Sequence, residues 1–144
     1  MRKNRRVRLQ IMILSSGTKI EVAKNYELLN LLLHTNHKAF QRTRCKFRND
    51  DCFIWIIEFG KVKNDWKNQI VGNDRIVEIS YCEHKKQTKG TYRLTFEKKA
   101  NCFIFLGLYK TDKEKSTQTS TNLIKILDKF DFEKSLDFNI KLYN

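Results

Sequence analysis

Apolar and polar residues alternate through much of the chain, with the two-residue period of half-buried strands. The segments with this pattern, or with a short apolar run between turn residues, are VRLQIMIL, RTRCKFR, CFIWIIEF, RIVEISYC, TYRLTF, CFIFLGLY, NLIKILDKFDF and LDFNIKLY. The turn sequence NDD joins two of them, so a hairpin is expected over 42–59. TYRLTF and CFIFLGLY form the next pair. NLIKILDKFDF also fits a helical period, so it is either a strand or a short helix.

One segment has the spacing of an amphipathic helix. Its apolar residues recur every three or four positions, at Val22, Tyr26, Leu28, Leu29, Leu31, Leu32 and Leu33. This pattern predicts a helix over 21–34 whose leucine face packs on a sheet. Six to eight short strands and one principal helix indicate an α+β fold, with a curled antiparallel sheet or a small β-barrel. A chain of 144 residues fits a single domain, 1–144, in which residues 1–8 form a basic arm.

Charge points to a polyanionic partner. The formal net charge is +13, and residues 1–48 carry +10 of it, because twelve basic residues stand there against two acidic ones. A compositional bias toward lysine and asparagine is the alternative explanation. Seven of those twelve residues are arginine, whose planar guanidinium suits phosphate and guanine, and this weakens that alternative. DNA or RNA is therefore the expected partner.

The basic residues fall into two groups. Four share one face of the strand predicted within FQRTRCKFR, because they are spaced two apart: Arg42, Arg44, Lys46 and Arg48. The opposite face carries Thr43, Cys45 and Phe47, which can join the core. The second group is in the N-terminal arm, at Arg5, Arg6 and Arg8. Both groups are candidate phosphate contacts.

Neither a cofactor nor a metal is expected. The cysteines lack the C-x-x-C spacing of zinc knuckles, and Cys82 with His84 gives only one loose pair. No secretory signal or apolar run of about 18 residues is present, so we expect a cytoplasmic protein with reduced thiols and no membrane partner.

No catalytic residue is assigned. Glu58 and Lys61 are one residue too far apart for the D/E-x-K pattern of metal-dependent nucleases. Acid–base cleavage of RNA, as in small basic toxins, would need several polar groups on one face, and the candidates are His34, His37, Arg42, Arg44 and Glu58. A small ribonuclease of this kind stays open as an alternative, although a histidine at a helix C-terminus more often acts as a cap.

The segment from Arg75 to Tyr109 resembles a known superfamily. YRLTF followed by FIFLGLYK is similar to the late hairpin of PUA-like barrels, which include the SRA-type modules that accompany bacterial restriction and phage-defence proteins. The resemblance implies a small twisted barrel that binds RNA or DNA, and in some members an aromatic pocket that holds a flipped modified base. The chain departs from the family in having no clear aspartate-bearing pocket signature and no glycine-rich clasp.

The resemblance also suggests where a base would be held. Aromatic candidates for the pocket are Trp55, Trp66, Tyr81 and Tyr92, with Trp55 expected in the core and Trp66 as a partly buried lid on it. Tyr92, Arg93 and Tyr109 are expected to frame a contact with base or backbone.

Two classes of function follow. The first is a small basic nucleic-acid-binding protein, either a modified-DNA reader or a phage or mobile-element factor linked to defence or anti-defence. The alternative is a protein inhibitor that binds a nucleic-acid-processing enzyme, since a basic surface also fits an acidic protein partner in a defence or anti-defence complex.

Overall fold

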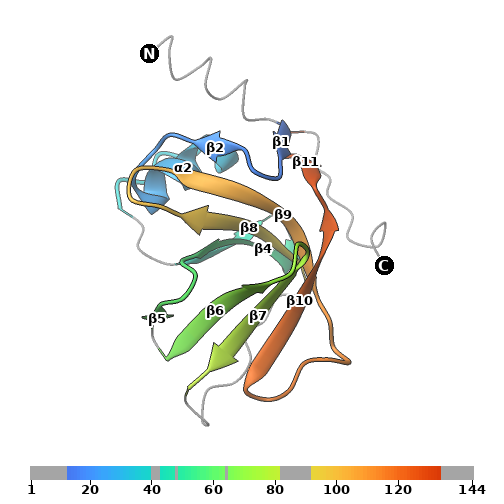
Figure 1. The fold of residues 1–144 in the computed structure, drawn as a ribbon. Helices are drawn as coiled ribbons and strands as arrows, with labels where there is room; N and C mark the ends of the chain where they lie inside the picture. The colour runs from blue at the N-terminus through green and yellow to red at the C-terminus, as the bar shows by residue number, and fades with distance from the viewer. Residues whose placement is uncertain (1–12, 40–42, 48, 64, 82–91, 134–144) are drawn as a thin grey trace.

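A computed structural model describes residues 13–39, 43–47, 49–63, 65–81 and 92–133 (Figure 1). Several predictions concern residues outside these ranges: the arm at Arg5, Arg6 and Arg8, the strand-face residues Arg42 and Arg48, the Cys82–His84 pair and the LDFNIKLY strand. Among the described residues, no helix combines the length and apolar character that crossing a bilayer requires.

The described chain forms one large sheet, one small sheet and one helix. The large sheet has nine strands in the order β3-β4-β8-β9-β10-β7-β6-β5, with β2 paired to β9, and the small sheet pairs β1 with β11. The elements are β1 (Ile13–Ser15), β2 (Lys19–Ile20), α2 (Asn25–Leu33), β3 (Arg44–Phe47), β4 (Asn49–Ile57), β5 (Val62–Lys63), β6 (Trp66–Val71), β7 (Arg75–Ser80), β8 (Tyr92–Lys98), β9 (Phe103–Thr111), β10 (Ser120–Leu127) and β11 (Lys129–Asp131).

The α+β fold class and its curled sheet are confirmed (Figure 1). The β3–β4 and β8–β9 pairs form as expected, and NLIKILDKFDF forms strands β10 and β11. The prediction that NDD forms the turn of the first hairpin is wrong, because β4 already begins at Asn49, which pairs with Phe47. One pairing differs from an all-antiparallel sheet, because β4 and β8 run parallel. Just after β4, Phe59 bridges to Asn68 of β6, and the Gly60 N–H donates to the Asn68 carbonyl at 3.1 Å. The sheet therefore curls until its two halves meet.

The helix is shorter than its sequence pattern predicts. Lys24 is extended, with φ −107° and ψ 147°, and its N–H donates to the Glu27 carboxylate at 3.1 Å, which fixes the start at Asn25. The helix ends before His34, which takes the left-handed conformation with φ 55°. Leu28, Leu29 and Leu32 are buried, as the leucine pattern predicts.

Two apolar clusters lie on opposite faces of the sheet. The larger cluster joins α2 to one face of β4, β8 and β9 and includes interlocked phenylalanine rings, such as Phe96 and Phe105 with centroids 5.1 Å apart. The smaller cluster lies inside the curl and consists of Trp55, Ile57, Ile76, Tyr109 and Leu123. We call these the outer and the inner cluster. The helix thus closes one face, while the curl of the sheet itself encloses the other.

The glycine in FIFLGLY, Gly107, lies where strands β9 and β10 approach each other closely. Its φ is +129°, and a Cβ placed there would come within 2.6 Å of the Leu127 carbonyl oxygen. The β9–β10 ladder shifts register between Lys125 and Leu127 at this point. A side chain at residue 107 would therefore obstruct the close approach of the two strands.

Candidate functional site

A cavity of about 450 Å³ opens at the inner cluster. Its wall combines two tryptophans with polar and charged groups; the lining residues are Asn25, Thr43, Arg44, Trp55, Ile56, Ile57, Glu58, Lys61, Val62, Trp66, Asn68, Glu78 and Lys98. Its volume is within the range of small-molecule sites, and so is its mixture of aromatic walls with a few polar groups. The arrangement can hold a flat aromatic ligand that also makes hydrogen bonds.

A buried ion pair supports the wall of this cavity. Arg93 on β8 donates from Nη1 to Glu78 Oε1 on β7 at 3.2 Å, and the two side chains are 0% and 5% exposed. The Arg93 guanidinium carbon also lies 4.3 Å from the centroid of the Trp55 ring. Burial lowers the pKa of Arg93, and the Glu78 carboxylate opposes that shift. Arg93 therefore remains a cation that holds both the Trp55 ring and the Glu78 carboxylate.

Glu78 is the middle member of a polar row. Its cross-strand partners are Asn68 on β6 and Thr121 on β10, so all three side chains lie on the same face of the sheet. Among the described residues, Asn68 Oδ1 and Thr121 Oγ1 are buried atoms that have no hydrogen-bond partner. Buried polar atoms are normally paired, so a row of this kind suits a ligand or water that donates hydrogen bonds.

The mouth of the cavity carries positive charge and one exposed apolar side chain. Lys61 pairs with Glu58 at 3.0 Å, and Val62 beside it is 60% exposed. Lys98 lies on the same rim, next to a second cavity of about 440 Å³ that shares Glu58, Lys61 and Lys98 with the first. Trp66 is half-buried and lines the cavity, while Trp55 is buried as predicted. The role of Trp66 as a lid stays a prediction.

No protein-family model matches the chain, and no curated protein matches it. A solved restriction enzyme shares its fold. The 5-hydroxymethylcytosine-specific restriction enzyme AbaSI superposes on 88% of this chain with a TM-score of 0.69 and 17% sequence identity. The match spans 44% of the length of AbaSI. At this identity the likeness shows the fold alone.

Two of the four basic residues predicted to share a strand face, Arg44 and Lys46, are described, and Arg44 lies at the cavity. Arg44 is half-buried, lines the cavity and has its guanidinium carbon 5.7 Å from the centroid of the Phe53 ring. Lys46 is exposed, and Phe47 faces the outer cluster as predicted. A register shift separates Lys46 from Phe47, so the strict two-residue alternation ends there. Contact of Arg44 and Lys46 with phosphate stays a prediction.

Three other predicted contact residues lie in the interior. Tyr92, Arg93 and Tyr109 are 1%, 0% and 1% exposed. Tyr92 packs in the outer cluster and Tyr109 in the inner one, while Arg93 pairs with Glu78. The structure therefore does not present them as an exposed contact surface. Any effect of Arg93 on binding would pass through Trp55 and Glu78, and that remains a prediction.

The groups considered for metal binding and RNA cleavage have structural partners. His34 Nε2 lies 2.9 Å from Glu133 Oε2, and Glu58 pairs with Lys61. Burial raises the pKa of Cys52 to about 12 and also raises the pKa of Cys45, so neither is an activated thiolate. Within the described ranges, no three His, Cys, Asp or Glu residues are grouped to hold a metal ion.

Sequence patterns did not reveal the polar row. Glu78 occupies a buried position between Ile76 and Ser80 on β7, but apolar residues occur on both faces of RIVEIS, so alternation does not show which face is inside. Asn68 and Thr121 come from segments ten and 43 residues away from Glu78. Only the strand order brings the three residues together.

Proposed function

We propose that this protein binds nucleic acid and reads a single base, drawn out of its stack, in the cavity beneath Trp66. The observation that carries the proposal is the joint presence of two tryptophans and a buried, fixed carboxylate in one cavity of about 450 Å³. A nucleobase is flat and edged with donors and acceptors, so it needs both an aromatic surface and polar groups aimed at its edge.

The chemistry of the wall is consistent with this role. Stacking on an aromatic side chain contributes about 1–3 kcal/mol per base. Glu78 and the Asn68 side-chain oxygen supply acceptors for the amino or imino groups of a base edge. Because Arg93 already orients Glu78, little rearrangement is needed when the base enters.

The similarity to AbaSI favours a modified DNA base as the ligand. AbaSI is specific for 5-hydroxymethylcytosine, and its fold matches this chain. The matched region is less than half of that enzyme, so the proposal covers the reading of DNA and not its cleavage. A place beside restriction or other defence proteins would fit such a reader.

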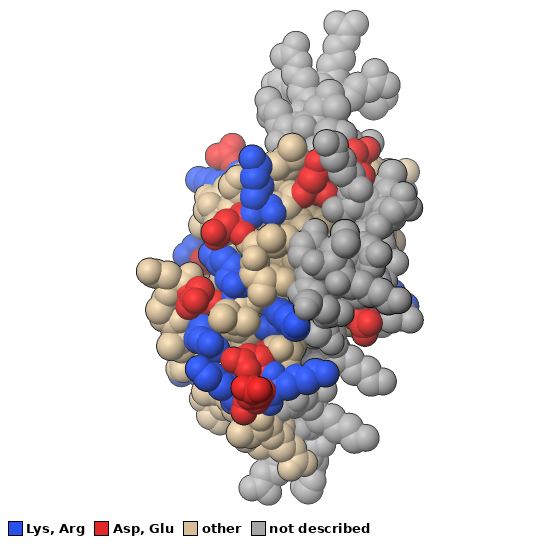
Figure 2. All heavy atoms as spheres, turned by 90° about the vertical axis from the view of Figure 1, so that its right-hand side faces the viewer, with Lys and Arg blue, Asp and Glu red and all other residues tan. Residues whose placement is uncertain are grey.

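Phosphate contacts would add affinity without base preference. The net charge of +13, the place of Arg44 in the cavity wall and the exposure of Lys46 support this part of the proposal. Figure 2 shows a face on which Lys and Arg are interspersed with Asp and Glu. A mixed surface of that kind is a weaker match to a phosphate track than a surface of one sign.

Binding to short duplexes tests the proposal directly. The duplexes would differ at one position, carrying cytosine, 5-methylcytosine or 5-hydroxymethylcytosine, and dissociation constants would be measured at several salt concentrations. We expect a preference for a modified base and, for six phosphate contacts, roughly a thousandfold loss of affinity between about 50 and 200 mM salt.

Trp66→Ala should weaken binding by about 1–3 kcal/mol with little change in melting temperature. Tyr26→Ala is the matched control, since Tyr26 is a half-buried aromatic residue on α2 that does not line the cavity. If the wild-type protein binds none of the duplexes, or if Trp66→Ala binds as the wild type does, the proposal is wrong.

A further inference from the structure

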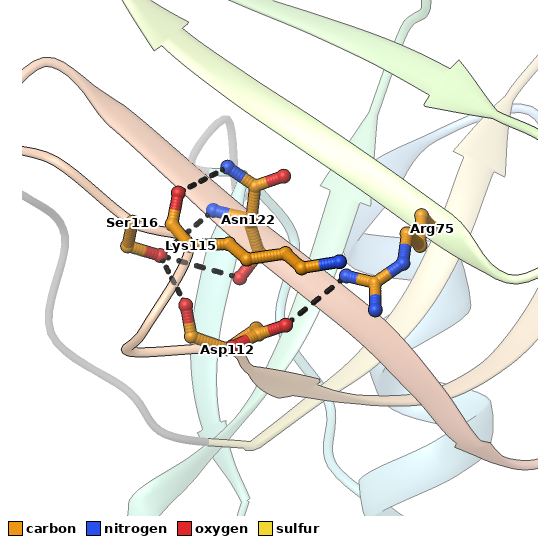
Figure 3. Close-up of polar contacts among 5 residues, drawn as sticks. All are labelled: Arg75, Asp112, Lys115, Ser116 and Asn122. Carbon is orange, nitrogen blue, oxygen red and sulfur yellow. Dashed lines mark hydrogen bonds and ion pairs between the residues drawn. The ribbon is translucent and has the colours of Figure 1, made fainter.

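The loop between β9 and β10 is polar throughout and contains its own network of hydrogen bonds. Residues 112–119 read DKEKSTQT, with no apolar side chain to bury. A loop of this composition ordinarily stays mobile, because nothing offsets the conformational entropy lost on ordering. Here a network of hydrogen bonds provides that anchoring (Figure 3).

Ser116 and Asn122 are the centre of the network. The Ser116 hydroxyl donates to the Asp112 carbonyl at 2.7 Å and accepts from the Asn122 N–H at 2.9 Å. The Asn122 side-chain amide donates to the Lys115 carbonyl at 2.9 Å. These bonds occupy the inner side of the loop and fix its backbone from within.

Arg75 holds the start of the loop. Its Nη1 donates to Asp112 Oδ2 at 3.1 Å, and Figure 3 shows the Lys115 side chain extending toward this pair. Arg75 and Lys115 together keep the pKa of Asp112 below its ordinary value, so the carboxylate remains charged and the loop remains tied to β7. Two cations against one carboxylate also leave this corner positive.

The side chains at the tip of the loop face outward. Thr117, Gln118 and Thr119 are exposed, and within the described part of the chain none of their side chains makes a hydrogen bond, although the backbones of Thr117 and Thr119 do. Hydroxyl and amide groups are the neutral donors and acceptors that proteins use on phosphate oxygens, sugars and base edges. The fixed backbone presents three such side chains without a further ordering cost.

The loop lies at the same end of the sheet as Trp66 in the cavity wall. The Ser80 N–H donates to the Thr119 carbonyl at 2.7 Å, and Ser80 is the cross-strand partner of Trp66. Beside them Tyr81 is 58% exposed, with its N–H donating to the Asp65 carbonyl at 2.7 Å. Thr119, Ser80 and Trp66 therefore follow one another across neighbouring segments, and Tyr81 is next to Ser80 in the chain.

We infer that the β9–β10 loop is a second nucleic-acid contact, in which Thr117, Gln118 and Thr119 hydrogen-bond the sugar–phosphate backbone or groove edge next to the base that is read. This inference rests on the proposed function. It adds a contact that is specific in geometry and neutral in charge, distinct from the cationic contacts that dominate nonspecific binding.

Because the three tip side chains are neutral, their contact should have a salt dependence different from that of a cationic contact. Each cationic phosphate contact adds about −0.9 to the slope of log K against log salt, whereas a neutral hydrogen bond releases no counterion. The Thr117→Ala/Gln118→Ala/Thr119→Ala variant should therefore bind duplex about tenfold to a hundredfold more weakly, with the salt slope and melting temperature of the wild type. Asn36→Ala/Asn73→Ala, at exposed polar positions away from the loop, is the matched control and should bind as the wild type does.

Ser116→Ala tests whether the fixed loop conformation matters. It leaves the three tip side chains in place and removes the hydroxyl that connects Asp112 to Asn122. Affinity should fall in the same direction, again with an unchanged salt slope.

Each remaining outcome has a definite meaning. Wild-type protein that binds duplex, with a triple variant that binds equally well, overturns the inference and leaves the proposed function intact. A reduced salt slope in the triple variant would show that the loop acts through charge. A melting temperature well below that of the wild type would show that the three side chains support the fold. Either result overturns the inference. Wild-type protein that binds no nucleic acid overturns both proposals.

Discussion

The outer and inner clusters differ in composition although they lie on the two faces of the same strands. The outer cluster is apolar, is closed by α2, and contains the interlocked phenylalanine rings. The inner cluster is smaller and borders a buried ion pair and an open cavity. Near it lie Asn68 Oδ1 and Thr121 Oγ1, two buried atoms that have no hydrogen-bond partner among the described residues. Stability is expected to come mainly from the outer cluster and ligand chemistry from the inner one, since a cavity lined by polar groups contributes little apolar burial to a core.

Truncation in the outer cluster should have the largest effect on stability. Phe96 is fully buried and packs on Phe105, so Phe96→Ala leaves a cavity and should cost about 3–5 kcal/mol of unfolding free energy. Trp66→Ala, at a half-buried position in the cavity wall, should cost far less. Chemical denaturation of both variants measures the contrast. Equal losses would mean that the two regions do not divide stability and function in this way.

The buried Arg93–Glu78 ion pair allows the same comparison to be tested at the inner cluster. Glu78→Gln leaves the Arg93 guanidinium buried without its counter-charge and should cost about 3–5 kcal/mol. Replacing both partners, as in Glu78→Leu/Arg93→Met, removes both desolvation penalties and should restore much of that stability. Nucleic-acid affinity should not recover with it if Glu78 reads the base. A double variant that recovers stability and binding together would assign the pair a purely structural role.

Sequence patterns predicted the elements of the fold better than the site. Strands β3, β4, β8 and β9 were predicted from local patterns of apolar and polar residues, and the leucines of α2 mark its buried face. Arg93 shows the limit of such patterns. Its strand, YRLTF, is central and packed on both faces, so all five residues from Tyr92 to Phe96 are buried.

The polar row could not be predicted because it depends on strand order. Asn68, Glu78 and Thr121 become neighbours only through the β6-β7-β10 order of the sheet. Local sequence carries no information on that order. A pairing as distant as Glu78 with Thr121 is a tertiary property, and the parallel β4–β8 pair is another.

The smallest expected effect concerns Tyr109, which belongs to the inner cluster. Burial, with Asp128 and Asp74 nearby, raises the pKa of its hydroxyl from 10.0 to about 12. The folded state holds this proton more tightly than the unfolded chain does. The contribution of the protonated hydroxyl to the unfolding free energy is therefore fully present below pH 10 and is lost as the pH rises from 10 toward 12. Tyr109→Phe has no such proton, while the other titrating groups are common to both proteins. The unfolding free energy of the wild type should therefore decline relative to that of Tyr109→Phe between about pH 9.5 and 11.5 when denaturant curves are compared. If the unfolding free energies of the two proteins change in parallel across that interval, the Tyr109 hydroxyl is open to solvent. Tyr109 would then belong to the wall of the cavity and not to the buried inner cluster.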